Sequence, residues 1–120
     1  MPDQIDALRN QLSRHREIHI SVTGRTSGRA ISIPVWFVFE DGKLYLLPVQ
    51  GTNSQWYKNV QTNPSIQIKA GDATAESQVG LITDAKQVAA VVEKFRAKYG
   101  ANDVKKYYSK FDVAVLAQMS

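Results

Sequence analysis

The chain has 120 residues, of which 43% are hydrophobic, and it carries 15 basic and 11 acidic side chains, two histidines and no cysteine. This length and composition are typical of one globular domain over residues 1–120, large enough to bury a core without covalent cross-links. The lack of cysteine excludes disulfides, thiolate metal sites and cysteine nucleophiles, and two histidines leave little for a histidine-rich centre, so we expect no metal site.

The N-terminal residues lack the basic segment and apolar run of a signal peptide, and no stretch approaches the roughly 20 apolar residues that span a bilayer. We therefore expect a cytoplasmic protein without a membrane span. The positive charge is uneven, because residues 86–110 hold seven basic and two acidic side chains. Such an excess suits an anionic ligand but falls short of a nucleic-acid-binding arm.

The first third of the chain predicts one helix followed by two strands. Apolar residues at helical spacing, beginning with Ile5, indicate a short amphipathic helix over 4–13. The pattern changes to alternation over 18–22, a turn composition fills 23–29, and a second alternating strand covers 30–39 with both faces buried.

A hairpin and a capped helix are expected next. Asp41 and Gly42 are typical of a two-residue hairpin turn, from which the chain returns as a strand over 43–49. Thr52 with Gln55 three residues later has the pattern of a capping box, so a short helix should follow.

The second half of the chain predicts strands over 65–70, 74–82 and 113–117, a long amphipathic helix between Asp84 and Gly100, and a short basic helix over 103–109. Gly80 suggests a bulge in its strand. A small closed or nearly closed antiparallel barrel decorated by helices satisfies this list, because closure removes the edges of such short strands.

Two segments have the composition of an anion site. Residues 23–29 hold two glycines, two arginines, two threonines and a serine, so backbone donors, guanidinium groups and hydroxyls can converge on a phosphate. An exposed hairpin turn with solvated arginines explains the same composition equally well. At 50–55 a strand passes into a helix, which should leave free N–H groups and the positive end of a helix dipole facing a ligand.

Two further residue patterns raise a metal-site and a nucleic-acid hypothesis. His15, Glu17 and His19 share one face if the strand geometry extends back to His15, although a pair of histidines at such a junction is more often simply exposed. The basic and aromatic residues of 105–111 would suit single-stranded nucleic acid, and the solvated face of a helix explains them as well. No strand carries an exposed series of basic and aromatic residues, which argues against nucleic acid.

Taken in order, five motifs resemble the deazaflavin-dependent nitroreductase family, which belongs to the split β-barrel flavin-binding superfamily together with the pyridoxamine 5′-phosphate oxidase-like proteins. The resemblance covers roughly residues 20–117, and its motifs are Thr23-Gly24-Arg25-Thr26-Ser27-Gly28, Ile33-Pro34-Val35-Trp36, Asp41-Gly42, Gly51 with Trp56-Tyr57-Lys58-Asn59, and Asn63-Pro64. It implies an α+β fold, a six-stranded antiparallel split β-barrel of the FMN-binding type. It also implies a groove for coenzyme F-420 (the deazaflavin) or FMN, and a homodimer.

The same resemblance implies the cofactor contacts. They are the phosphate ligands Arg25, Thr26 and Ser27, the ring neighbours Pro34, Val35 and Trp36, the backbone donors Gln50, Gly51, Thr52 and Asn53, and the helix residues Trp56 and Asn59. For Trp56 and Tyr57, packing of the helix on the barrel is the favoured alternative. The family usually has lysine at the position of Gln50, and the loss of that charge costs about 1–3 kcal/mol in a charge-assisted bond, which favours FMN or a weakened site.

The resemblance implies an oxidoreductase that transfers a hydride from the reduced cofactor to a small nitroaromatic, quinone or enone. A proton must follow the hydride, and Tyr99, Tyr107 and Tyr108 lie in the segment that lines the substrate side in relatives. Helix packing is the alternative explanation for these tyrosines. A cofactor-storage module without turnover and a small barrel for single-stranded nucleic acid are the competing functions.

Overall fold

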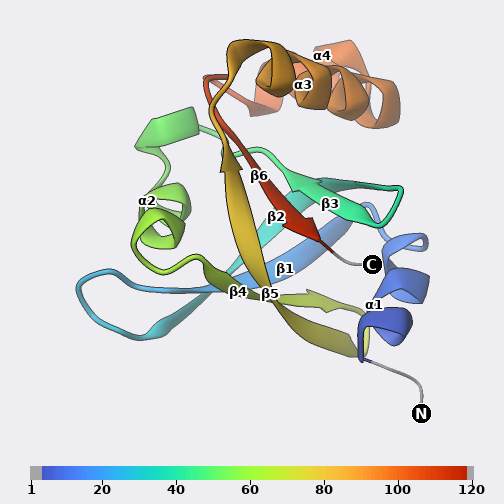
Figure 1. Ribbon diagram of the computed structural model, residues 1–120. Helices are drawn as coiled ribbons and strands as arrows, with labels where there is room; N and C mark the ends of the chain where they lie inside the picture. Colours follow the sequence, from blue (N-terminus) through green and yellow to red (C-terminus); the bar gives the residue numbers. More distant parts are fainter. Residues whose placement is uncertain (1–3, 119–120) are drawn as a thin grey trace.

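The computed structural model describes the backbone of residues 4–118 and the side chains of residues 7–118. Six antiparallel strands close into a barrel in the order β1-β2-β3-β6-β5-β4, with β1 pairing to β4 (Figure 1). The strands are β1 (Glu17–Thr23), β2 (Ala30–Glu40), β3 (Lys43–Leu46), β4 (Ser65–Ala70), β5 (Ala73–Ile82) and β6 (Ala114–Gln118). The expected α+β fold with a six-stranded antiparallel barrel is confirmed.

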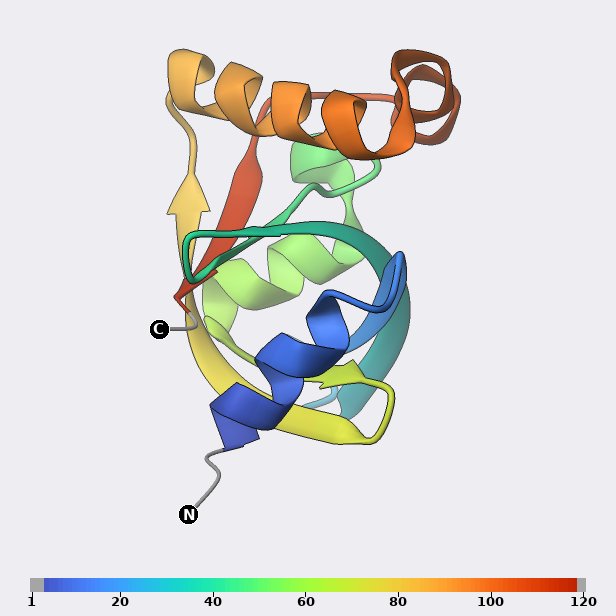
Figure 2. The same ribbon diagram turned by 90° about the vertical axis from the view of Figure 1, so that its right-hand side faces the viewer.

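Helices cover the barrel at different places. They are α1 (Gln4–Leu12), the single 3₁₀ turn η1 (Gly51–Asn53), α2 (Gln55–Thr62), α3 (Ala85–Tyr99) and α4 (Ala101–Tyr107). Both ribbon views place α3 and α4 together beyond one end of the barrel, with α1 at the far side from them (Figures 1 and 2). The side chain of Ile5, expected on the apolar face of the first helix, lies outside the described residues.

Two apolar clusters hold these elements together. The larger fills the barrel with the inward residues of the strands and is closed by Leu8 and Leu12 of α1 and by Tyr57 of α2. The smaller joins the outer face of β2 to the apolar stripe of α3, where Val38 packs with Phe95. The alternation along β2 therefore separates barrel core from helix-covered surface.

The hairpin turn and the two ends of α3 have conformations that their residue types favour. Asp41 and Gly42 both have positive φ (53° and 74°), which is the type I′ geometry that matches the twist of a two-residue hairpin. Asp84 caps α3, because its Oδ2 accepts a hydrogen bond from Gln87 N at 3.1 Å. Gly100, with φ 95°, ends α3 as predicted.

Several local features differ from the sequence predictions. β3 ends at Leu46 rather than at residue 49, because Pro48 has no N–H with which to continue the ladder. Gly80 forms no bulge, since it pairs directly with Leu116 in an unbroken register. α4 begins at Ala101, directly after the glycine that ends α3, and stops at Tyr107.

Candidate functional site

A cavity of about 360 Å³ lies against the barrel wall, between β2, the start of α2 and the end of α4. It is lined by Ile33, Pro34, Val35, Trp36, Leu47, Val49, Gln50, Ser54, Gln55, Trp56, Tyr107 and Tyr108. We call this the barrel-wall cavity. Its size lies within the roughly 300–1,000 Å³ typical of small-molecule sites, and its walls are mostly apolar and aromatic.

Trp36 is the centre of an aromatic stack beside this cavity. One face of its ring lies on Tyr99, with centroids 4.3 Å apart and planes at 11°, and Tyr107 also stacks on Trp36, at 4.4 Å and 28°. With Tyr99 and Tyr107 both stacked on it, Trp36 offers a ligand mainly its ring edge. Tyr107 is the outer member of the stack, with 38% of its surface exposed.

The hydroxyl of Tyr99 is held by the backbone. It accepts from Phe37 N at 3.1 Å and donates to the Arg16 carbonyl at 2.6 Å, with the Phe37 carbonyl 2.9 Å away. Burial raises the pKa of this phenol. Tyr99 is not among the residues that line the barrel-wall cavity, so these contacts tie α3 to β2 and to the start of β1.

Tyr107 and Tyr108 do line the cavity. Burial raises the pKa of Tyr107, with a smaller contribution from Glu17. Burial also raises the pKa of Tyr108 far above its usual value, and the neighbouring Tyr107 and Tyr99 add to the effect. Tyr108 therefore carries its proton throughout the physiological pH range.

The start of α2 faces the same cavity. The expected capping box at Thr52 and Gln55 is wrong, because the helix begins at Gln55 with Ser54 as its N-cap, and the Ser54 hydroxyl accepts from Gln50 N instead of from the helix. No side chain caps α2. Since Ser54, Gln55 and Trp56 all line the cavity, the positive end of the helix dipole points toward it.

The backbone N–H groups of the loop before α2, residues 50–53, already donate hydrogen bonds within the fold. The four donors have partners within the fold: Gln50 N binds Ser54 Oγ (2.8 Å), Gly51 N binds the Pro48 carbonyl (3.1 Å), Thr52 N binds Asp112 Oδ1 (3.0 Å) and Asn53 N binds the Gln50 carbonyl (3.0 Å). The free donors expected at 50–53 are thus engaged, and the uncapped end of α2 supplies them instead.

Asp112 anchors this loop. Its Oδ2 also accepts from Thr52 Oγ1 at 2.7 Å and lies 3.4 Å from Lys110 Nζ. Burial acts to raise the pKa of Asp112, but the hydrogen bonds from Thr52 and the nearby Lys110 outweigh it and hold the pKa below its usual value. Gly51 is required here, because its φ is +55° and a Cβ at this position would overlap Asp112 Oδ1.

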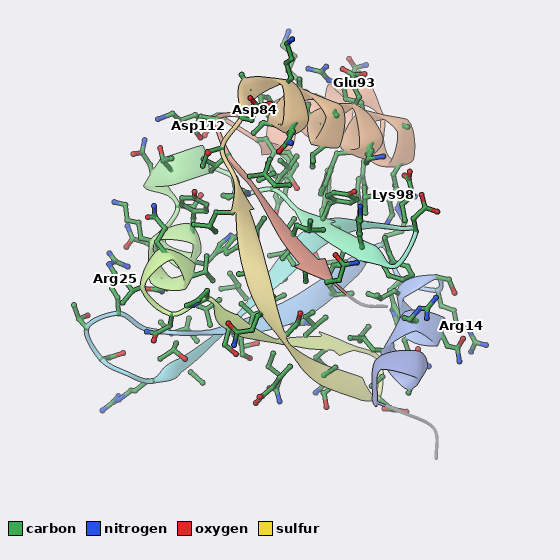
Figure 3. All side chains as sticks on the ribbon, viewed as in Figure 1. Arg14, Arg25, Asp84, Glu93, Lys98 and Asp112 are labelled. Atoms are coloured by element: carbon green, nitrogen blue, oxygen red, sulfur yellow. The ribbon has the colours of Figure 1, made fainter. Side chains whose placement is uncertain are left out.

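Arg25 joins the glycine-rich turn to α2. Its backbone N and its Nη1 both donate to Asn59 Oδ1, at 3.1 and 2.7 Å, and its Nη2 donates to Gln55 Oε1 at 2.8 Å (Figure 3). Asn59 is buried, whereas the Arg25 side chain is exposed. Gln55 lines the barrel-wall cavity, so the guanidinium group that binds it lies next to the cavity wall. The remaining N–H groups of this guanidinium have no hydrogen-bond partner among the described residues.

The residues predicted to bind the cofactor fall into two groups. Those that line the cavity are Pro34, Val35, Trp36, Gln50 and Trp56, together with the candidate proton donors Tyr107 and Tyr108. Those that do not are Arg25, Thr26, Ser27, Gly51, Thr52, Asn53 and Asn59, together with Tyr99. Thr26 and Ser27 are exposed in the turn, and Ser27 Oγ accepts from Arg29 N.

Five further residues line the cavity without having been predicted as individual contacts. Ser54 and Gln55 lie in the 50–55 segment that was expected to face a ligand, and Ile33 belongs to a motif of the resemblance. Leu47 and Val49 were predicted only as residues of the strand that returns from the hairpin.

The histidine hypothesis finds no support in the packing. His15 is half-buried with Nε2 3.2 Å from Gln11 Oε1, while Glu17 and His19 are exposed on β1. Over residues 4–118, no three histidine, aspartate or glutamate side chains gather in an arrangement suited to a metal ion. In the same part of the chain, no helix is both long and apolar enough to cross a membrane.

The closed six-stranded antiparallel barrel, the helices around it and the cavity on its wall define an α+β barrel protein with a candidate small-molecule site. The chain belongs to the family described as "Uncharacterized protein conserved in bacteria (DUF2255)", whose model matches residues 9–115. A search of curated proteins gave no match.

Solved structures share the fold at low sequence identity. An F420-H2 dependent reductase (FDR-A) is 18% identical over 86% of this chain and 94% of its own, with a TM-score of 0.67. HutZ, the heme storage protein from Vibrio cholerae, is 12% identical over 95% and 88% of the two chains, with a TM-score of 0.70. A candidate pyridoxamine 5′-phosphate oxidase from Listeria innocua is 13% identical over 96% and 92%, with a TM-score of 0.68. The barrel fold that the resemblance implied is thus shared with these solved structures.

Proposed function

We propose that the barrel-wall cavity binds the ring of FMN or of the deazaflavin coenzyme F-420, and that the protein reduces a small organic acceptor. The observation that carries this proposal is the composition of the cavity. An aromatic and apolar wall from β2 and α4 meets an uncapped helix start and a guanidinium group, which together suit a planar ring that carries an anionic tail.

The dimensions fit such a ligand. A volume of about 360 Å³ accommodates a fused ring system of drug size, and the lining residue Gln55 accepts a hydrogen bond from the Arg25 guanidinium. Arg25 is fixed in place by Asn59, so its free N–H groups are already oriented for a phosphate. Thr26 and Ser27 stand exposed on the same turn and would complete the phosphate contacts.

Gln50 makes the site less positive than in the resembled family. Its side chain lines the cavity, and Lys110, whose backbone bridges to Gln50, is already engaged with Asp112. We therefore propose FMN ahead of the more highly charged deazaflavin coenzyme. The variant Gln50→Lys would restore the missing charge, and an increase in affinity for coenzyme F-420 relative to FMN is expected from it.

When bound in reduced form, the cofactor would supply the hydride. The residues of this chain would position the ring against Pro34 and Val35, keep water from one side with Trp56, and deliver a proton from Tyr108 Oη. Tyr108 is the first candidate for that role because it lines the cavity, although burial, which raises the pKa of its phenol, makes it a weaker acid than a free tyrosine. Tyr99 Oη is committed to the backbone of Arg16 and Phe37, which leaves Tyr107 as the second candidate donor.

Fluorescence titration with FMN and with coenzyme F-420 tests the binding step. Arg25→Ala should weaken binding of either cofactor at least tenfold, while Arg29→Ala, an exposed arginine of the same turn, should leave it within about twofold. A protein that binds neither cofactor, or an Arg25 variant that binds as well as the parent, would contradict the proposal.

Turnover separates a reductase from a storage module. The protein loaded with reduced cofactor is mixed with a nitroaromatic, a quinone or an enone, and cofactor oxidation is followed by absorbance. Tyr108→Phe should slow oxidation by each acceptor tenfold or more without a matching loss of cofactor affinity. Binding without oxidation by any acceptor would favour the non-catalytic alternative.

Homodimer formation is part of this proposal. The β1-β2 hairpin extends beyond the barrel and exposes Ile31, and Leu81 on β5 is exposed as well. In a dimer these apolar residues would be covered by the partner. Analytical ultracentrifugation of the parent protein and of Ile31→Asp would show whether the dimer exists and whether this face forms it.

A further inference from the structure

A second pocket lies away from the barrel-wall cavity and shares no lining residue with it. It occupies about 400 Å³ between the end of α1, the central part of β2 and the C-terminal half of α3, and it is lined by Leu12, Ser13, Arg14, His15, Arg16, Phe37, Val38, Phe39 and Lys98. We call this the basic pocket. In Figure 3, Lys98 and Arg14 lie on the opposite side of the view from Arg25.

The charge of the basic pocket is uncompensated. Arg14, Arg16 and Lys98 all line it, and none of its lining residues is acidic. Among the described residues, the ion pairs of the protein join Lys94 to Glu40, Arg96 to Glu93 and Lys110 to Asp112, so the three cations of the pocket take part in none.

Lys98 is held in an environment that disfavours its charge. Its Nζ lies 3.5 Å from the centroid of the Phe37 ring and donates one hydrogen bond to the Phe37 carbonyl at 2.8 Å. Burial, together with the nearby Arg16 guanidinium, lowers the pKa of Lys98 to about 8. The ammonium retains two N–H groups, and no carboxylate is placed to receive them.

The rest of the pocket is apolar and firmly packed. Phe37 is buried in the barrel core and Phe39 packs against the same cluster, while Leu12 closes the pocket from α1. Arg16 is oriented by the Tyr99 ring, 5.0 Å from its guanidinium carbon, and its carbonyl accepts from the Tyr99 hydroxyl. The pocket therefore combines well-packed apolar residues with three cationic side chains. This combination suits an organic anion, whose charged group contacts the cations while its apolar part contacts the apolar residues.

From this arrangement we propose that the basic pocket is a second binding site, for an organic oxyanion whose phosphate or carboxylate group is held by Lys98, Arg16 and Arg14 while its apolar part rests on Phe37 and Phe39. The bound anion replaces the missing counter-charge of Lys98. Arginine binds such groups with paired N–H donors, and lysine adds a point charge.

The pH dependence of binding follows from the groups that face Lys98. On the segment before β1 these are Arg14, His15 and Arg16, and β2 contributes no titratable group to the pocket. On α3 the Tyr99 ring lies 5.0 Å from Lys98 Nζ, while Lys94 is turned to Glu40. The anion stabilises the charged form of Lys98, so its affinity is highest below pH 8 and falls as the pH rises through the pKa of Lys98 in the free protein.

The test is calorimetric titration with phenyl phosphate and with benzoate, using inorganic phosphate and phenol as probes that carry only one half of the chemistry. Binding of either organic anion, at least tenfold tighter than both half-probes, is the expected result. Whichever of phenyl phosphate and benzoate binds more tightly identifies phosphate or carboxylate as the preferred headgroup. Equal binding of inorganic phosphate and phenyl phosphate, or no binding of either organic anion at millimolar concentration, would overturn the proposal.

Variants locate the site. Lys98→Met removes the charge but keeps an aliphatic side chain against Phe37, and Arg16→Gln removes the charge of an exposed side chain. Each variant should weaken binding of the organic anion at least tenfold. Lys86→Met, an exposed lysine on the same helix but outside the pocket, should change affinity less than twofold.

Arg25→Ala serves as the control for the barrel-wall cavity. If this variant loses binding of the organic anion while Lys98→Met retains it, the anion occupies the other site and the proposal is wrong. In the parent protein, affinity should fall at least threefold between pH 7 and pH 9, where the charge of phenyl phosphate is constant. In Lys98→Met this dependence should disappear, and its persistence would assign it to another group.

Discussion

Replacing Tyr99 with phenylalanine removes one hydroxyl from the junction of α3, β1 and β2 and leaves the ring stack in place. In the parent protein that hydroxyl accepts from Phe37 N and donates to the Arg16 carbonyl. The ring itself lies on Trp36 at 4.3 Å, an arrangement that phenylalanine preserves. The substitution therefore tests hydrogen bonding with little change in packing.

The cost can be worked out from the two partners. The Phe37 N–H is buried and would lose its acceptor, which costs about 1–3 kcal/mol for an unsatisfied donor. The Arg16 carbonyl is only partly buried, so water can replace the lost donor there at small cost. We expect the free energy of unfolding to fall by about 2 kcal/mol, which corresponds to a decrease of roughly 8 °C in Tm for a domain of this size.

Tyr107→Phe is the matched control, because Tyr107 also stacks on Trp36 and undergoes the same chemical change. Its ring is partly exposed and its hydroxyl makes no hydrogen bond to another described residue, so the free energy of unfolding should change by less than about 0.5 kcal/mol. Urea unfolding followed by far-UV circular dichroism measures both variants. Equal stability of the two would refute the assignment of Tyr99 as a structural residue.

Three further predictions concern stability. Gly51→Ala should lower the free energy of unfolding by about 3 kcal/mol in urea, because a left-handed φ and overlap with Asp112 both oppose it; a loss below about 1 kcal/mol would contradict the loop geometry. Asp84→Ala should cost about 1 kcal/mol by the same assay through loss of the α3 cap, and an unchanged midpoint would mean that Asp84 does not cap. Asp112→Asn should be less stable than the parent at pH 7, and the difference should shrink as the pH falls below about 3.9, because a carboxylate with a lowered pKa stabilises the fold above its unfolded pKa and loses that effect as the pH falls through its folded pKa; a difference that does not shrink at low pH would exclude a charge effect.

Most of the fold could be predicted because its signals are local. Alternation places Val35 and Phe37 inside the barrel and Trp36 outside, and the Asp41-Gly42 pair fixes the first hairpin. Helix α3 follows from its cap, its apolar stripe and its terminal glycine. The pairing of β3 with β6 had no such signal, since the two strands lie some 70 residues apart in the sequence.

The candidate site was less predictable because its contacts are not local. Arg25 and Asn59 are 34 residues apart, and nothing in either segment indicates that the guanidinium binds the buried amide. The capping-box pattern at Thr52 was misleading for the same reason, since its hydroxyl is taken by Asp112, 60 residues away. In both cases a tertiary partner outcompeted the local hydrogen bond that the sequence suggested.

The position of the barrel-wall cavity follows from the way in which the outer face of β2 is covered. That face is apolar at Trp36 and Val38, and the stripe of α3 buries it as far as Tyr99. Gly100 then turns the chain, and α4 carries Tyr107 back over Trp36. Pro34 stays exposed on β2, and it lines the cavity together with residues of α2 and α4. The same aromatic residues that complete the packing of α3 therefore form the wall of the cavity, which explains why Tyr99 belongs to the fold while Tyr108, nine residues later, faces the ligand space.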